Sequence, residues 1–270
     1  MIADSRTTQA DLVDVRQEGA VLHVDLVAPN GINSLTREVR TALLAALTGP
    51  ALDPTVRVVV LRGRGRTFCV GQALDEHAGR LADDVGTAFD CVDAEYRPLA
   101  RAIRALPKPV VAAVDGACAG AGVSLAMACD LRVLSAKSKL TFAFIGIGLT
   151  ADTGLTAALI QTVGAPRTKA MLMLDQPLSA DQALAAGLAD VVADNDDFAA
   201  ELDGIVNRLA AGPTAAYARI KAVVHDAESA TFERTLELES EAQRALGLTT
   251  DHQVAVSAFL EKQPVVFAGS

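Results

Sequence analysis

The chain has 270 residues, of which 51% are hydrophobic, and it carries a formal net charge of −9. This length and composition allow the core of one large domain, or of a domain with an appendage. The negative charge disfavours nucleic acid as a partner, because phosphate binding needs clustered lysine and arginine. The apolar runs are much shorter than the roughly 20 residues of a membrane helix.

The N-terminal segment MIADSRTTQADL has no basic patch followed by an apolar stretch. We therefore expect no signal peptide and a cytoplasmic protein. The four cysteines are scattered without a C-x-x-C pair, at Cys69, Cys91, Cys118 and Cys129. This pattern favours buried, reduced thiols over a disulfide or zinc framework, and no spacing of His, Cys and carboxylate residues indicates a metal site.

Short β-branched or alternating apolar runs predict five strands, at residues 12–15, 21–27, 56–61, 110–114 and 131–134. Helical spacing fills the gaps between them. One helix is expected at residues 35–47 with Ser34 as its cap, and another at residues 84–105, ended by Pro107 and Pro109. This order of elements predicts an α/β core.

Beyond about Asp194 the sequence shows helical patterns alone, at residues 196–210, 214–226, 231–246 and 251–261. We therefore predict two parts: a core over residues 1–195 that carries the site, and a helical section over residues 196–270. The apolar faces of this section are typical of helices that pack on a neighbouring subunit.

Two glycine-containing stretches suggest a site. RGRGRTFCVGQALDE, residues 62–76, turns at Gly71 and by itself is typical of an ordinary strand-to-helix loop. ACAGAGVSLAMACD, residues 117–130, bends at Gly120 and Gly122 and then begins a helix. The unpaired N–H groups of such a helix start can hold an anion or a developing oxyanion.

A third stretch, FAFIGIGLTADTGLTAALIQTVG, spans residues 142–164. In this order the three stretches resemble the crotonase family, the enoyl-CoA hydratases and isomerases, over roughly residues 11–269. The resemblance also includes APNGINSLT, LSADQALAAGLADVV and TTDHQVAVSAFLEKQPVVF. It implies a spiral of strand-strand-helix units, a helical C-terminal section that builds trimers or hexamers, and an acyl-CoA thioester as ligand. Coenzyme A is then part of the substrate, and no separate cofactor is expected.

In the family, two backbone N–H groups polarise the thioester carbonyl, and the matching positions here are Gln72 and Ala121. Preset donors in a dry pocket stabilise the charge that develops when a proton leaves the neighbouring carbon. Many relatives carry glycine at the second position, but alanine retains the N–H. The resemblance therefore implies an oxyanion hole between the turn at Gly71 and the helix start at Gly120 and Gly122.

Relatives that hydrate a 2-enoyl-CoA carry two glutamates, and the matching positions here are Ser124 and Phe144. A hydroxyl of ordinary pKa and a phenyl ring cannot act as a paired acid and base, so we expect slow hydration. Asp152 matches a position where isomerase branches carry a carboxylate, while the dehalogenase branch has its nucleophilic aspartate in a similar DT context. We predict that Asp152 is the single acid/base. The competing interpretation, which can coexist, is a helix N-cap.

The resemblance also implies contacts with coenzyme A. They are the segment Gln72, Ala73, Leu74 and Asp75, together with Phe259 and Lys262 of a neighbouring tail. Ala73 replaces the usual aspartate of the family. Asp75, Glu76 and His77 are either a catalytic lid or, in the simpler interpretation, a solvated helix start. The acyl pocket is expected to include Phe89, Tyr96, Phe142 and Phe144.

The predicted reaction is double-bond isomerisation of an enoyl-CoA, within fatty acid metabolism. One alternative is a hydratase (a lyase) or a hydrolytic acyl-CoA enzyme that uses Asp152 and water. The other is a noncatalytic acyl-CoA binding protein. Turnover of a 3-enoyl-CoA separates the binding protein from the enzymes.

Overall fold

The computed structural model describes residues 12–269, and the segment 1–11, on which the expectation of no signal peptide rests, lies outside it. The larger sheet has the strand order β1-β2-β3-β5-β7-β10, in which β1 is antiparallel to β2 and the other pairs are parallel. These strands are β1 (Val13–Glu18), β2 (Val21–Leu26), β3 (Val58–Gly63), β5 (Val110–Val114), β7 (Leu131–Ser135) and β10 (Val191–Ala193).

A smaller sheet lies beside the larger one, with the order β4-β6-β8-β9. Its strands are short: β4 (Thr67–Cys69), β6 (Ala117–Ala119), β8 (Lys139–Thr141) and β9 (Leu178–Ser179). The five strands predicted from sequence all belong to the larger sheet, and each is confirmed to within a few residues. The smaller sheet was missed because two or three residues are too few to show an alternating pattern.

The chain repeats one unit: a strand of the larger sheet, a strand of the smaller sheet, and a helix. β3 and β4 lead into α2, β5 and β6 into α4, and β7 and β8 into α5. The helices of the core are α1 (Arg37–Thr48), α2 (Leu74–Asp83), α3 (Arg97–Ala105), α4 (Ala121–Ala128), α5 (Leu155–Leu174) and α6 (Ala180–Ala185). The predicted α/β fold of strand-strand-helix units is confirmed.

Two local predictions were wrong. Thr36, not Ser34, caps α1, because its Oγ1 accepts a hydrogen bond from the Val39 N–H at 3.3 Å. The helix expected over residues 84–105 is also shorter: α3 follows a π-helical turn at Val92–Tyr96. Asp84 ends the preceding helix with an extended backbone, and its carboxylate accepts from the Gly86 N–H at 2.8 Å. This local bond competes with the helical one.

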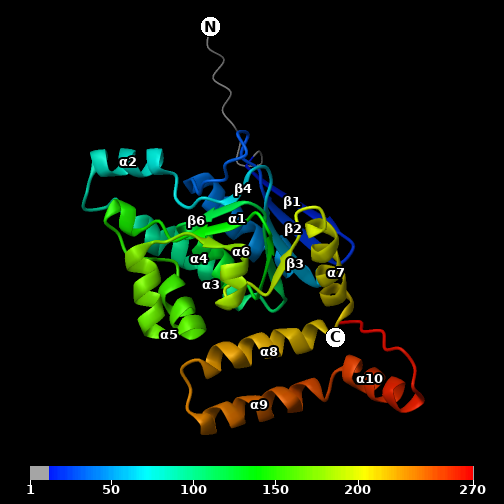
Figure 1. Cartoon of the computed structure of the whole chain (residues 1–270). Helices are drawn as coiled ribbons and strands as arrows, with labels where there is room; N and C mark the ends of the chain where they lie inside the picture. Colours follow the sequence, from blue (N-terminus) through cyan, green and yellow to red (C-terminus); the bar gives the residue numbers. More distant parts are fainter. Residues whose placement is uncertain (1–11, 270) are drawn as a thin grey trace.

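The helices predicted after Asp194 are confirmed as α7 (Phe198–Ala211), α8 (Thr214–Ala227), α9 (Phe232–Leu246) and α10 (Thr250–Glu261). α7 covers the larger sheet, where Phe198 and Leu202 join a cluster with Val58. The other three form a layer below the core, which we call the helical arm (Figure 1). The division into two parts at residue 195 stays a prediction.

The final segment returns from α10 to the junction of core and arm (Figure 1). The Arg57 guanidinium donates to the Phe267 carbonyl and to the Thr214 hydroxyl, each at 2.9 Å. The buried Asp251 carboxylate accepts from the Ala268 and Gly269 N–H groups. These bonds tie the arm to the core.

All four cysteines are free and buried, as predicted. Burial raises the pKa of each thiol, so none is poised as a thiolate nucleophile. Within residues 12–269, no helix is both long and apolar enough to cross a bilayer.

Candidate active site

The two glycine turns predicted from sequence meet in the structure. Gly71, after β4, has φ of +83°, and Gly120, at the N-terminus of α4, has φ of +53°. A Cβ at Gly71 would lie only 3.0 Å from both the Ala119 carbonyl oxygen and the Ala121 nitrogen. The turns approach closely enough to require glycine, and this approach brings Gln72 and Ala121 to the same place.

Gly122 makes a similar close contact one residue further along. A Cβ there would lie 2.3 Å from the carbonyl oxygen of Cys69, at the end of β4. The start of α4 therefore packs directly on the backbone that leads into the first turn. Since Ala121 is the first residue of α4, its N–H has no acceptor one turn earlier in the helix.

A backbone bridge orients the peptide between Gly71 and Gln72. The Leu35 N–H donates to the Gly71 carbonyl at 2.7 Å, and the Ala73 N–H returns a longer bond of 3.4 Å to the Leu35 carbonyl. Carbonyl and N–H of one planar peptide point in opposite directions. The bond to Gly71 therefore holds the Gln72 N–H pointing away from Leu35.

Arg40 supports this backbone bridge through a hydrogen bond to Leu35. Its side chain is fully buried, and its guanidinium donates to the Leu35 carbonyl, to Glu76 at 2.8 Å and to Glu95 at 2.7 Å. The ring of Tyr96 lies 4.8 Å from the guanidinium carbon. Burial alone would raise the pKa of Glu76, but the bonds from Arg40 and from the Arg37 N–H lower it, so the pair stays ionised. This cluster, Arg40 with Glu76 and Glu95, joins α1, α2 and the turn before α3.

Asp152 lies in a tight bend before α5. Thr153 and Gly154 both have positive φ, at 57° and 87°. Gly154 occupies the N-cap position of α5, and no side chain caps that helix. The Asp152 side chain is therefore not an N-cap, which removes the competing interpretation of this residue.

The environment of Asp152 favours the neutral carboxylic acid. Burial raises the pKa of the carboxyl, and the hydrogen bond from the Thr153 hydroxyl, at 2.9 Å, offsets part of that rise. After burial, the negative charge of Asp152 also contributes to the raised pKa of Tyr96. A carboxylate with a raised pKa is a stronger base than an ordinary one.

Ser124 lies one turn after Ala121 on α4 and faces a cavity of about 290 Å³. Its side chain is almost fully buried, and its Oγ has no hydrogen-bond partner among the described residues. Thr153 and Gly154 line the same cavity, which we call the α3–α4 cavity. Phe144, the other position of the missing glutamates, is buried in the main hydrophobic cluster and does not line this cavity.

The segment expected to contact coenzyme A runs into the exposed start of α2. Leu74 is 57% exposed, and Asp75 is also exposed. His77 is buried and packs edge-on against Phe89, and its Nδ1 lies 3.3 Å from Nε2 of the Gln72 side chain. Glu76 belongs to the Arg40 cluster. These contacts give Glu76 and His77 structural partners.

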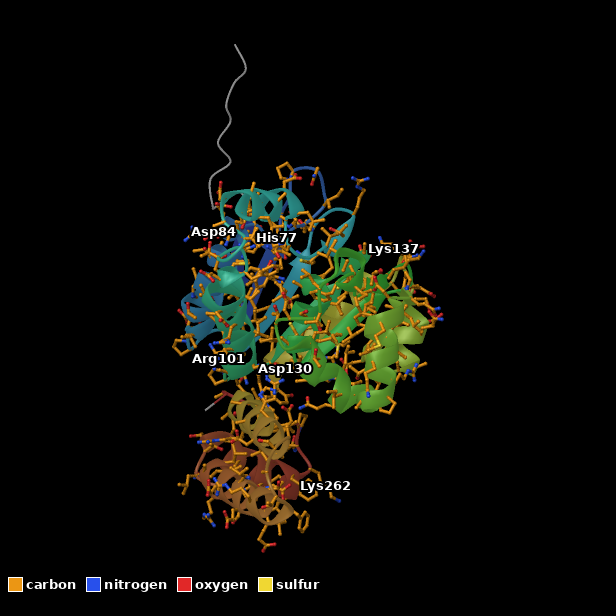
Figure 2. All side chains as sticks on the ribbon, turned by 90° about the vertical axis from the view of Figure 1, so that its left-hand side faces the viewer. His77, Asp84, Arg101, Asp130, Lys137 and Lys262 are labelled. Atoms are coloured by element: carbon orange, nitrogen blue, oxygen red, sulfur yellow. The ribbon has the colours of Figure 1, made fainter. Side chains whose placement is uncertain are left out.

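Phe259 and Lys262 lie at the end of α10 in the helical arm. Figure 2 shows Lys262 at the opposite end of the molecule from His77. Phe259 is 82% exposed. Within one chain these residues do not reach the turn at Gln72, so the predicted contact requires a second subunit.

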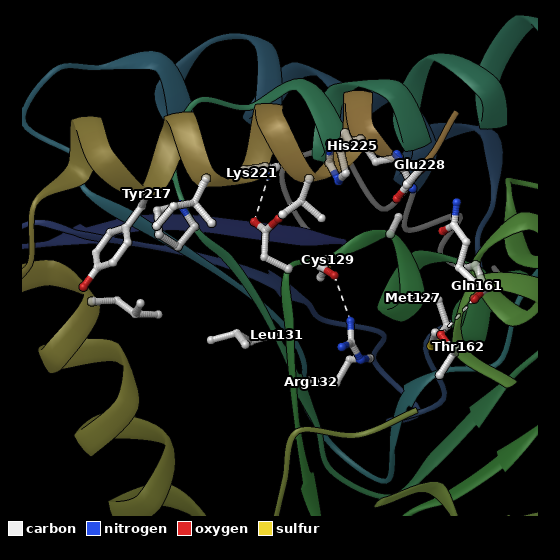
Figure 3. Close-up of a pocket in the computed structure, with 18 residues that line it drawn as sticks. Met127, Cys129, Leu131, Arg132, Gln161, Thr162, Tyr217, Lys221, His225 and Glu228 are labelled. Carbon is white, nitrogen blue, oxygen red and sulfur yellow. Dashed lines mark hydrogen bonds and ion pairs between the residues drawn. The ribbon is translucent and has the colours of Figure 1, made fainter. Parts of the chain in front are cut away.

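A second cavity, of about 390 Å³, lies between α8 and the core (Figure 3). The buried Lys221 ammonium of α8 bonds Asp130 at 2.8 Å, and Arg132 donates to the Cys129 carbonyl at 2.9 Å. Arg104, Met127, Ala128 and Ala158 line both cavities, which are therefore neighbours. In the described part of the chain, no group of His, Cys, Asp and Glu residues is gathered to hold a metal ion.

Comparison with known proteins agrees with this architecture. The profile of the family Enoyl-CoA hydratase/isomerase matches residues 16–270. The 1,2-epoxyphenylacetyl-CoA isomerase of Escherichia coli is 36% identical and aligns over 93% of this chain and 96% of its own. A protein of Rhodobacter capsulatus, provisionally named an enoyl-CoA hydratase, is 37% identical over 89% of this chain and 90% of its own.

Among solved structures, a Mycobacterium abscessus protein provisionally assigned as an enoyl-CoA hydratase/isomerase superposes with a TM-score of 0.91. It is 40% identical over 96% of this chain and 100% of its own. The fold and the paired glycine turns define an acyl-CoA enzyme of the crotonase type. The chain belongs to the enoyl-CoA hydratase/isomerase family.

Sequence reasoning missed the Arg40 cluster and the arginines around the α3–α4 cavity. The sequence did contain one indication of the Arg40 cluster, because Arg40 shares the buried face of α1 with Val39, Leu43 and Leu47. A charged residue on such a face needs buried partners. Its partners come from residues 36 and 55 positions away, and no local pattern identifies them.

Proposed function

We propose that the protein shifts the double bond of an enoyl-CoA, with Asp152 as the acid/base and the Gln72 and Ala121 N–H groups as an oxyanion hole. The observation that carries the proposal is the half-buried Asp152 carboxyl, which has a raised pKa and no capping role. At the two positions of the missing glutamates, the chain has only the Ser124 hydroxyl and a buried phenyl ring.

The reaction needs one base and no water. Asp152 removes a proton from C2 of a 3-enoyl-CoA, and the electron pair spreads over a dienolate whose oxygen accepts from the two N–H groups. The same carboxyl then returns the proton at C4, so that the double bond ends between C2 and C3. Preset backbone donors stabilise this charge without reorganising, and removing one such donor elsewhere costs about 10²–10³ in rate.

The raised pKa of Asp152 suits both halves of this reaction. A carboxylate of ordinary pKa is a weak base toward carbon, while a carboxyl whose charged form is poorly solvated takes and returns the proton more readily. The bond from Thr153 keeps the carboxyl in one orientation. The E. coli relative, an isomerase by name, supports the same class of reaction.

Assembly is the second part of the proposal. Phe259 and Lys262 lie far from the turn at Gln72 in their own chain, so we expect a trimer, or a hexamer of two trimers, in which they contact coenzyme A bound to a neighbour. The helical arm offers exposed apolar residues for this assembly, among them Phe232, Leu248 and Leu260. We place the reaction in the cytoplasm.

The direct test is turnover of trans-3-hexenoyl-CoA, followed by the absorbance of the conjugated 2-enoyl thioester. We expect isomerisation at a typical enzyme rate. Hydration of crotonyl-CoA by the same preparation should be slower by about 10²–10⁴-fold, as expected without a positioned acid and base. Binding of the thioester without turnover would contradict the enzyme proposal and indicate a noncatalytic acyl-CoA binding protein instead.

A hydratase or hydrolase that uses Asp152 and water is the second candidate, favoured by the name of the R. capsulatus relative. It predicts rapid hydration of crotonyl-CoA or release of free coenzyme A. Either result at a typical enzyme rate would contradict the isomerase proposal.

A further inference from the structure

Three arginines of α3 line the α3–α4 cavity: Arg97, Arg101 and Arg104. They follow one another at intervals of four and three residues, so they form a single stripe along the helix, about 10 Å long. Asp93 is the one carboxylate that lines this cavity. The wall formed by α3 is therefore strongly positive.

Two of the three arginines have carboxylate partners. Arg97 pairs with Asp93, and Arg104 with Glu228 of the arm at 2.7 Å. Arg101 pairs with no carboxylate among residues 12–269. Figure 2 shows it on the core, close to the helical arm. Arg101 is exposed and lines the cavity wall, so its planar fork is free to bind a carboxylate from outside the chain.

The opposite wall of the cavity is α4. Ser124 contributes its buried, unpartnered hydroxyl there, and Met127 and Ala128 continue the wall. The cavity begins one helical turn beyond Ala121 and ends about 10 Å along α4 from it. Thr153 and Gly154, next to Asp152, complete the lining.

We infer that the α3–α4 cavity holds the acyl group of the substrate and that Arg101 binds a carboxylate at the far end of that group. The residues expected from sequence in the acyl pocket, Phe89, Tyr96, Phe142 and Phe144, do not line this cavity, so the inference replaces that expectation. The inference rests on the proposed function only in placing the thioester at Gln72 and Ala121. From there an acyl chain runs past Ser124 toward the arginine stripe. The substrate class is then the mono-CoA thioester of a dicarboxylic acid.

The alternative explanation is that the arginine stripe has only a structural role. Arginines on the solvent face of an amphipathic helix are common, and Arg104 in the last turn also suits the helix dipole. That explanation requires neither a cavity along the stripe nor a buried, unpartnered polar atom that lines the same cavity. The unsatisfied Ser124 Oγ favours an oxygen-bearing ligand, because buried hydroxyls are usually hydrogen-bonded.

Binding of saturated thioesters tests the inference without any turnover. Succinyl-, adipoyl- and suberoyl-CoA carry a terminal carboxylate, and butanoyl-, hexanoyl- and octanoyl-CoA are their methyl-ended counterparts of equal length. We expect calorimetry to show that one of the carboxylates, at its best-fitting length, binds about tenfold or more tightly than its counterpart. The preference should shrink as salt is added. Equal binding at every length would overturn the inference.

The variant Arg101→Gln tests whether the carboxylate preference comes from Arg101 itself or from the overall positive charge of the α3 wall. It should lose the preference for the carboxylate and leave binding of the methyl-ended thioesters unchanged. Arg208→Gln, an exposed arginine of α7 that lines neither cavity, is the matched control and should change neither. An equal loss for both kinds of thioester in Arg101→Gln would also overturn the inference.

Two further experiments are needed. One shows whether the site binds a free acid or the thioester, and the other shows which of the two proposals is contradicted if a prediction fails. Free adipate should not displace adipoyl-CoA at equal concentration, and displacement would assign the site to a free acid. Turnover of 3-hexenedioyl-CoA and of 3-hexenoyl-CoA then tests the two proposals separately. A carboxylate preference in binding without any isomerisation would contradict the proposed function alone, whereas isomerisation without the preference would contradict the subsite alone.

Discussion

At the scale of single residues, Asp152 shows how backbone geometry decides the role of a carboxylate. From sequence, an aspartate before a helical pattern is a good N-cap. In the structure, Thr153 and Gly154 adopt positive φ and place Gly154 at the cap. The carboxyl is left half-buried beside the Thr153 hydroxyl, which donates a hydrogen bond to it, and burial raises its pKa. It is thereby available for chemistry.

Asp152→Asn should abolish the base with little change to the fold. Asparagine keeps the shape and can still accept from Thr153, but it cannot take a proton. We expect isomerisation of 3-hexenoyl-CoA to fall by about 10²–10⁴-fold, mainly in kcat. The melting temperature should stay level or rise slightly, because the variant removes the desolvation of a buried charge.

The control for this variant is Asp115→Asn, a partly buried aspartate whose Lys137 partner lies 3.0 Å away, outside the site. It should keep wild-type kcat. A wild-type kcat in Asp152→Asn would end the assignment of Asp152 as the base.

The pH dependence follows from the same raised pKa. The base must be ionised, so kcat/KM should fall as the pH drops through a pKa higher than that of an ordinary aspartate. Stability should have the opposite trend. A carboxyl whose pKa is raised on folding stabilises the folded protein below its unfolded pKa, and that stability is lost as the pH rises through the folded pKa.

Measuring kcat/KM and the melting temperature of wild type and Asp152→Asn across this range checks both trends. The pH-dependent difference in melting temperature between the two proteins reports Asp152 itself. An acid limb at the ordinary carboxyl pKa would contradict the raised value.

At the scale of elements, the turn at Gly71, which we propose as part of an oxyanion hole, depends on neighbours that are distant in sequence. The Leu35 N–H anchors the Gly71 carbonyl, and the Arg40 cluster holds Leu35 in place. Gly122 lets α4 approach β4 to a distance that any side chain would block. The two proposed donors are therefore positioned by α1, β4 and α4 together.

Arg40→Met should destabilise the protein and weaken catalysis. The variant leaves Glu76 and Glu95 partly buried without their main cation, and losing one member of a buried ion pair typically costs about 3–5 kcal/mol. We expect a loss near the lower end of that range, since both carboxylates retain some contact with solvent. Chemical denaturation measures it.

The functional part of this prediction concerns the turn. Variant molecules that remain folded should show a lower kcat with a smaller change in KM, because the Gln72 N–H is less well oriented. Arg97→Met is the control for stability, since its pair with Asp93 is exposed and contributes little. Equal free energies of unfolding for the two variants would contradict the role given to Arg40.

At the scale of the whole molecule, the helical arm exposes large apolar side chains that its own chain does not cover. α9 has no buried residue, and several large apolar side chains of the arm are mostly exposed. We therefore propose that this surface packs against another subunit. The bonds from Arg57 and Asp251 nevertheless hold the arm at a defined place below the core.

Light scattering of the purified protein should report a trimer or a hexamer. Phe259→Asp should weaken acyl-CoA binding, because the predicted contact lies across the interface, while Asp203→Asn on the exposed surface of α7 should not. A stable monomer at micromolar concentration would contradict both the assembly and the shared coenzyme A contact.

Much of the fold was predictable because it is encoded locally. The run at residues 110–114 is apolar throughout, as expected of a parallel strand buried on both faces, and the run at residues 131–134 is apolar except for Arg132. The C-terminal helices have clear periodicity. Glycines at the two turns were likewise visible. Together with the resemblance to a family, these turns identified Gln72 and Ala121 as the expected N–H donors.

Tertiary structure decided what depends on distant partners. The partners of Arg40, the burial of Asp152 and the free hydroxyl of Ser124 all arise from elements that meet only in the folded chain. The cavity beside α3 also exists only there, and nothing in the sequence distinguishes the arginines that line it from those of an ordinary solvent face. Periodicity reports which face of a helix is polar, whereas the free energy of a charge depends on what the remaining chain places beside it.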